Sequence, residues 1–149
     1  MSIIEKDLNP DVFIGISLPL DYTDKDGFFK KTKTTLEQTK SNIKNLLMTM
    51  KGERLGNPTF GSELMRILFE PNVNDLQGQI EESIRSSMDE FLPFVNIRDI
   101  IVTPSTRRPN LLNIRLQFSL NIDQTVESVS LDLAAADEVF ADPTIAEGT

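Results

Sequence analysis

The chain has 149 residues, of which 39% are hydrophobic, and a net charge of -8 at pH 7. This length suffices for one hydrophobic core and is too short for two ordinary domains. Because the chain is acidic and shows no basic face with interleaved aromatic residues, nucleic acid is not an expected partner.

The first predicted element is a strand over residues 12–20, where apolar side chains recur at every second position. Pro19 lacks a backbone N–H, which restricts such a strand to a sheet edge or makes it end there. A polar turn cluster follows over residues 21–27, and Phe28 and Phe29 are expected to anchor a loop.

Three helices are predicted next, each with apolar residues at helical spacing on one face. They cover residues 34–50, 62–69 and 74–92, with polar capping residues at their starts. The segment 52–61 between the first two contains three glycines and a proline, so it is expected to be a loop.

From Val95 onward the apolar period changes to two, which predicts three strands. They begin near Val95, Leu112 and Val129, and short polar segments separate them. Short connections favour an antiparallel meander. The order of one strand, three helices and then strands indicates an α+β fold rather than an alternating α/β fold.

We expect residues 1–133 to form this single domain. Residues 134–149 contain four acidic and no basic side chains and lack the alternation of a strand, so they are expected to be a mobile acidic tail. No stretch resembles a membrane span or a signal peptide, so neither membrane insertion nor export is expected.

The most specific stretch covers residues 52–72. It contains Gly-Glu-Arg, then Pro-x-Phe-Gly, and then Leu-Phe-Glu-Pro. This pattern resembles the baseplate wedge family of contractile phage tails, sometimes labelled lysozyme-like, whose relatives include the wedge subunit of type VI secretion baseplates. By element order the resemblance extends over residues 12–133, although only 52–72 match at motif level.

The resemblance implies a domain similar to the handshake part of tail sheath proteins. It also implies a structural role: the protein would bind the baseplate wedge core and provide the platform on which the tail sheath begins to polymerise. Expected partners are wedge core proteins, the sheath protein and the tail tube, with several copies in a sixfold virion baseplate assembled in the host cytoplasm. Such platforms work by strand addition at a sheet edge. An edge strand near the N-terminus and a last strand followed by a loose arm would suit that role.

The resemblance also points to partner-binding residues at motif positions, namely Glu53, Arg54, Phe60, Glu70, Pro71 and Asn72. Glu53 and Arg54 are expected to form an ion pair that orders the loop or faces a partner, with a solvated surface pair as the alternative. For Phe60 the alternative is core packing. Many relatives have arginine where this chain has Asn72, so no arginine-dependent contact is carried over.

An enzyme is not expected. The chain has no cysteine or histidine, which removes the usual nucleophiles, zinc ligands and imidazole bases, and no cofactor or metal is expected. A peptidoglycan-cleaving enzyme remains the alternative, with Glu70 as general acid and Glu53 or Glu63 as its partner. The absence of tryptophan and the single tyrosine argue against a sugar-binding cleft. A subunit of a type VI or related injection machine is the other alternative.

Overall fold

The structure, a computed structural model, describes residues 7–9, 11–23, 27–69, 75–104, 111–121 and 126–134. Its elements in chain order are β1 (Gly15–Ile16), β2 (Lys31–Thr32), α2 (Thr35–Met48), α3 (Leu64–Phe69), α4 (Leu76–Phe91), β3 (Val95–Pro104), β4 (Leu111–Leu120) and β5 (Glu127–Ala134). The predicted α+β class, the three helices and the C-terminal meander are confirmed.

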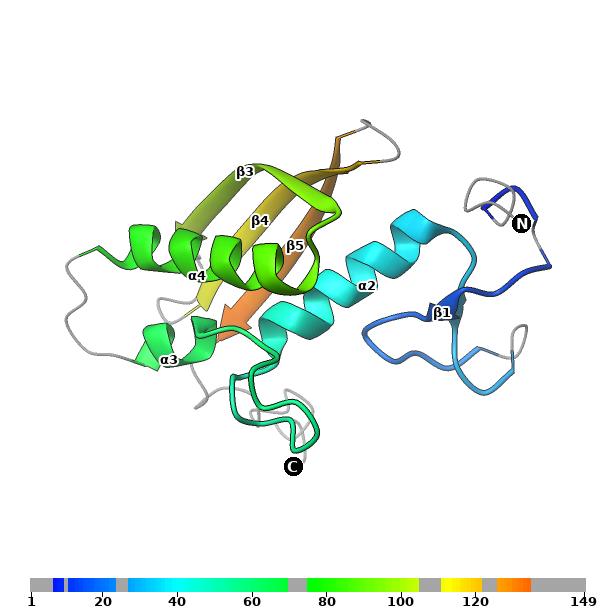
Figure 1. Cartoon of the computed structure of the whole chain (residues 1–149), viewed down its shortest axis with the longest axis horizontal. Coiled ribbons are helices and arrows are strands. Elements are labelled where there is room, and N and C mark those ends of the chain that lie inside the picture. The colour runs from blue at the N-terminus through cyan, green and yellow to red at the C-terminus, as the bar shows by residue number, and fades with distance from the viewer. Residues whose placement is uncertain are drawn as a thin grey trace, which may run out of the picture.

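Strands β3, β4 and β5 form an antiparallel sheet in that order (Figure 1). Their side chains alternate, so that one face is apolar and the other carries polar groups such as Arg115 and Ser130. The helices lie on the apolar face, where α4 contacts β3 and α2 contacts β5. The domain therefore has two layers, with a single core between helices and sheet.

The core is built from the apolar stripes that the sequence predicted. Its fully buried side chains come from α2, α3, α4 and β4, and they are Ile43, Leu46, Leu47, Leu64, Ile80, Ile84, Met88, Ile114, Leu116 and Phe118. Polar caps fix the starts of two helices. The Thr34 hydroxyl accepts from the Glu37 N–H at 3.2 Å, and the Asp75 carboxylate accepts from the Gly78 N–H at 3.0 Å.

The prediction of a long, half-buried strand over residues 12–20 is wrong. Only Gly15–Ile16 pair, antiparallel to Lys31–Thr32, which the sequence analysis did not predict as a strand. The apolar side chains at alternate positions are partly exposed, with Ile16 at 47% and Leu20 at 61%. The ladder contacts α2 but is only two residues long, too short to bury an apolar face, so period two here does not mark a core strand.

Two further predictions fall on segments that the structure does not describe. Residues 135–149 lie outside the described residues, so the expected acidic tail stays a prediction. The same holds for much of the short polar segments expected between the meander strands, since residues 105–110 and 122–125 are not described. Among the described residues, no helix is both long and apolar enough to cross a bilayer.

The loop between α2 and α3 is closed at its base by backbone hydrogen bonds. The Ser62 N–H donates to the Thr49 carbonyl at 2.8 Å, and the Lys51 N–H donates to the Ser62 carbonyl at 3.3 Å. The Ser62 hydroxyl also donates to the carbonyl of Leu47 at 2.6 Å. Figure 1 shows this loop projecting away from the helices. The two ends of the loop are thus held together where the loop leaves the domain.

Gly61 allows this closure. Its φ is +126°, and a Cβ there would lie 2.5 Å from the carbonyl oxygen of Thr49. Both features exclude a side chain, because the conformation is unfavourable for L residues and the obstructing atom is backbone.

Replacing Gly61 by alanine is therefore expected to lower the free energy of unfolding by about 2 kcal/mol or more, measured by urea denaturation. Gly56→Ala is the matched control, since it lies in the same loop with open space around its Cα. The control should change stability by less than about 0.5 kcal/mol. Equal stabilities of the two variants would contradict this account of the loop base.

Candidate functional site

Glu53 and Arg54 lie in the loop over residues 50–62, and the expected ion pair between them is not formed. Glu53 instead accepts a hydrogen bond from the backbone N–H of Met50, with a distance of 3.0 Å to its Oε2 atom. The carboxylate is close to the start of the loop, so it satisfies a backbone donor there rather than its neighbour's guanidinium. The prediction that Glu53 and Arg54 pair is wrong, whereas a role of Glu53 in ordering the loop agrees with this contact.

Arg54 lies over the ring of Phe60, with 4.2 Å between its Cζ atom and the ring centroid. Phe60 in turn packs edge-on against Phe91 of α4, with 5.2 Å between the ring centroids and an interplanar angle of 66°. Phe60 is half-buried and contacts the core. The three side chains form a stack that attaches the loop to α4.

The rest of the loop is exposed. Residues 51–59 are all exposed, and Leu55 is exposed completely. Backbone hydrogen bonds from the Gly52 N–H to the Pro58 carbonyl at 2.7 Å and from the Asn57 N–H to the Arg54 carbonyl at 3.1 Å fix the shape of this exposed part. An exposed segment whose backbone is already ordered loses less entropy when it binds a partner.

The other three predicted site residues, Glu70, Pro71 and Asn72, lie outside the described residues. The structure therefore brings together Glu53, Arg54 and Phe60 only. Partner binding by any of the six residues stays a prediction.

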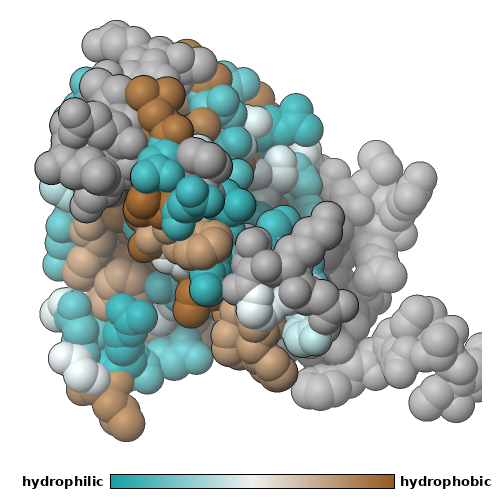
Figure 2. Space-filling model, turned by 90° about the vertical axis from the view of Figure 1, so that its right-hand side faces the viewer, coloured by the Kyte–Doolittle hydropathy of each residue, from teal (hydrophilic) through white to brown (hydrophobic). Residues whose placement is uncertain are grey.

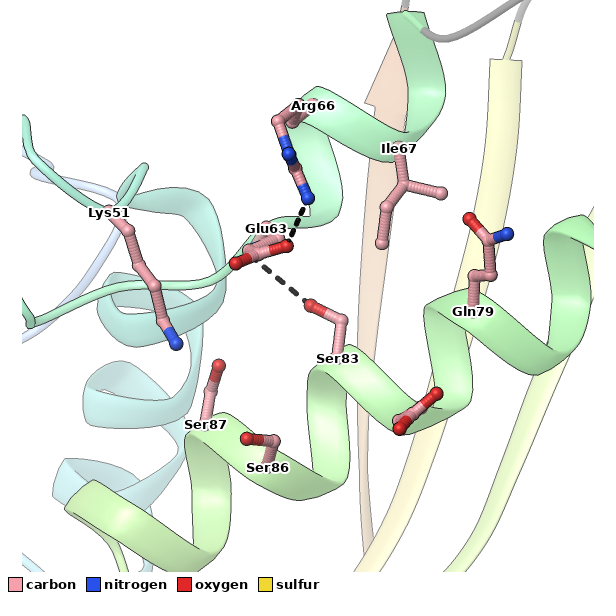
Figure 3. A pocket seen from close by; sticks show the side chains of 9 residues that line it. Lys51, Glu63, Arg66, Ile67, Gln79, Ser83, Ser86 and Ser87 are labelled. Atoms are coloured by element: carbon pink, nitrogen blue, oxygen red, sulfur yellow. Dashed lines mark hydrogen bonds and ion pairs between the residues drawn. The ribbon is translucent and has the colours of Figure 1, made fainter. Parts of the chain in front are cut away.

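A polar hollow of about 330 Å³ lies between α3, α4 and the start of the loop (Figure 3). In it, Glu63 Oε2 accepts from Arg66 at 2.5 Å, and the Glu63 N–H donates to the Ser83 hydroxyl at 3.2 Å. Glu63 is thus held by Arg66 in the first turn of α3, while Glu53 is held by the backbone of the loop. Among the described residues no group of three acidic, histidine or cysteine side chains is placed to hold a metal ion.

Sequence reasoning missed a second feature, an apolar groove of about 470 Å³ between α2 and β5. Leu18, Met48 and Leu131 contribute its apolar walls, and Lys44 and Asp132 also line it. Strand β5 is the last strand of the sheet, and within the described residues its outer edge pairs with no other strand. The amphipathic pattern of α2 predicted the helix, but it could not show that the C-terminal turn leaves Met48 exposed at 56%.

Solved structures with the same fold support this architecture. A protein from Geobacter sulfurreducens, provisionally named a tail lysozyme, is 18% identical, with a TM-score of 0.64 over 72% of this chain and 96% of that chain. A chain of the type VI secretion baseplate complex is 12% identical, with a TM-score of 0.56 over 66% of this chain and 92% of that one.

A chain of the anti-feeding prophage baseplate is 18% identical, with a TM-score of 0.52 over 83% of this chain and 86% of that chain. At these identities the likeness establishes the fold alone. No curated protein sequence matches the chain.

The family described as baseplate wedge protein gp25 matches residues 34–125. This range begins at the cap of α2, includes the ordered loop and α4, and extends past the end of β4. It covers well over half of the 149 residues. The chain therefore belongs to the family of baseplate wedge protein gp25.

Proposed function

We propose that this protein is a wedge subunit that binds the baseplate core and provides the first platform for tail sheath polymerisation. A strand of the first sheath ring adds to the outer edge of β5. The observation that carries this proposal is the outer edge of β5, which no described strand pairs with and which lies beside the apolar groove. An added strand gains backbone hydrogen bonds from the edge, and its alternate side chains enter the groove.

The sheet has two outer strands, and their features favour β5 over β3. Strand β3 has an irregularity in its register between Ile97 and Asp99 and ends at Pro104, two features that impede pairing along an edge. Strand β5 keeps a continuous register with β4 from Glu127 to Ala134 and contains no proline. It therefore offers the longer regular edge for a partner strand.

The loop over residues 50–62 is the proposed contact with the wedge core. Glu53 and Phe60 hold the loop in shape, and Arg54 and the exposed tip face outward. The neighbouring motif residues Glu70, Pro71 and Asn72 extend this proposed contact. In this proposal the core contact and the sheath contact lie on opposite sides of Thr49, which lines the groove and also closes the base of the loop.

The proposed location is the baseplate of a virion tail that is assembled in the host cytoplasm. Sixfold symmetry would set the number of copies, and the tail tube would be a neighbour. A type VI or related injection machine would use the same mechanism. Sheath and tube genes beside capsid genes would identify a phage, and their absence would favour a cellular machine.

The groove provides a direct test with Met48→Glu. A carboxylate there would lose its water beneath an added strand, and Lys44, one turn earlier on α2, would compensate only part of this loss. The expected net cost is about 2 kcal/mol, or about thirtyfold in binding. Reconstituted baseplates carrying this variant should contain the subunit but lack sheath when viewed by electron microscopy.

Ile101→Glu is the matched control, because Ile101 is also partly exposed but belongs to β3. It should leave sheath formation unchanged. Because an acidic residue at a helix C-terminus costs up to about 1 kcal/mol, thermal unfolding of both variants checks that each remains folded. Normal sheaths on folded Met48→Glu baseplates would argue against the β5 site.

We further propose that the protein carries out no chemistry. Glu53 accepts from the Met50 N–H and Glu63 pairs with Arg66, so the positions of both candidate second carboxylates are accounted for by contacts that need no catalytic role. Purified protein is expected to give no clearing of isolated cell walls. Clearing that disappears in Glu70→Gln would establish the lysozyme-like alternative instead.

A further inference from the structure

Five lysines gather at the end of the molecule where β1 and β2 lie beside α2. Lys30, Lys31, Lys33, Lys40 and Lys44 line a hollow of about 380 Å³ there. Glu37 is the one acidic side chain in the lining, and its carboxylate accepts from the backbone N–H of Lys33 at 3.0 Å. In a chain with net charge -8, this is a local concentration of positive charge.

Little of this positive charge is neutralised by the described residues. Lys40 forms an ion pair with Glu127 at 3.0 Å. The ammonium groups of Lys31 and Lys33 lie 4.5 Å and 5.5 Å from the ring centroid of Phe13, a contact that leaves their charge uncompensated. An anionic partner would therefore find several unpaired ammonium groups close together.

Exposed apolar side chains adjoin these lysines. Phe13 lies beneath Lys31 and Lys33, and it is itself 43% exposed. Phe28 and Phe29 directly precede Lys30 and stack edge-to-face with 4.9 Å between their centroids, although Phe28 is 72% exposed. Figure 2 faces this end of the molecule and shows hydrophobic side chains exposed between hydrophilic ones. Aromatic groups left in water beside a charged hollow are typical of a binding surface.

We define the lysine–aromatic surface as Phe13, Phe28, Phe29 and the five lysines. The expectation that the chain has no basic face with interleaved aromatic residues is therefore wrong at this end of the molecule. We propose that the chain's own C-terminal segment, residues 135–149, docks on this surface. The segment contains four acidic side chains and no basic one, which complements the lysines. Its larger apolar residues, Val139, Phe140 and Ile145, complement the exposed aromatic rings.

The end of β5 lies within reach of this surface. Asp132, two residues before the end of β5, lines the groove beside α2. Leu18 and Lys44 line both that groove and the lysine hollow, so the two hollows adjoin. The fourteen residues of α2 span about 21 Å, whereas an extended segment of fifteen residues spans about 50 Å. The segment can return along α2 with length to spare.

Tethering favours this occupant over an acidic segment of another protein. A segment attached to the same chain through a short connection has an effective concentration of about a millimolar, so even a weak site is filled. The inference does not depend on the proposed role in sheath assembly, because it concerns the isolated protein.

The full-length protein offers a clean test, since it contains no cysteine. A spin label attached to Thr149→Cys broadens amide NMR signals near the C-terminus. Docking predicts loss of signal for residues 30–44 and for Phe13. The signals of Gln77 and Gln79 at the start of α4, on the side of the molecule away from β1 in Figure 1, are the internal control. The loss should be reversed in about 1 M salt, where the Debye length is about 3 Å.

The matched control neutralises the segment and leaves the folded body untouched, through Asp137→Asn, Glu138→Gln, Asp142→Asn and Glu147→Gln. This variant should restore the signals of residues 30–44. Broadening that survives neutralisation and salt, or no broadening in the parent protein, would overturn the proposal. Docking on a second molecule is tested by mixing spin-labelled protein with ¹⁵N-labelled protein that carries no spin label. If the signals broaden only through such contacts between molecules, the surface binds a second copy, and docking within one chain is overturned.

Discussion

The architecture depends on covering one apolar sheet face. Strands β3 to β5 alternate apolar and polar side chains, so only one face needs burial, and α2 and α4 bury it. Phe118 on the central strand and Ile84 on α4 are fully buried in this layer. Because the helices cover the apolar face, the opposite face can remain polar and in contact with water, and the sheet needs no second layer of helices.

This one-sided arrangement has consequences for assembly. Among the described residues both outer strands of the sheet have an unpaired edge, and α2 lies beside β5 so as to leave a groove rather than a closed contact. The loop after α2 leaves the domain through a base fixed by Gly61 and Ser62, and the stack of Arg54, Phe60 and Phe91 holds it against α4. Rigid exposed loops and open edges on a small well-packed core are suited to protein–protein contacts.

The helices and the meander could be predicted because their apolar residues recur with a regular period over many positions. Residues that end a helix, such as Pro93, mark the boundaries. The prediction of a long strand over residues 12–20 was wrong because its apolar pattern is short. Alternation over residues 12–20 identifies a repeat of two but cannot show whether a second layer exists to cover it. Sequence adjacency likewise suggested a pair of Glu53 and Arg54, whereas the fold offered each a different partner, the Met50 N–H and the Phe60 ring.

The central claim is that the outer edge of β5 receives a strand from the sheath. A cryo-electron microscopy map of the assembled baseplate with its first sheath ring tests it most directly. The account predicts a sheath strand hydrogen-bonded along Glu127–Ala134, with an apolar side chain in the groove beside Met48. A first sheath ring that contacts the wedge elsewhere and leaves this edge unpaired would contradict it.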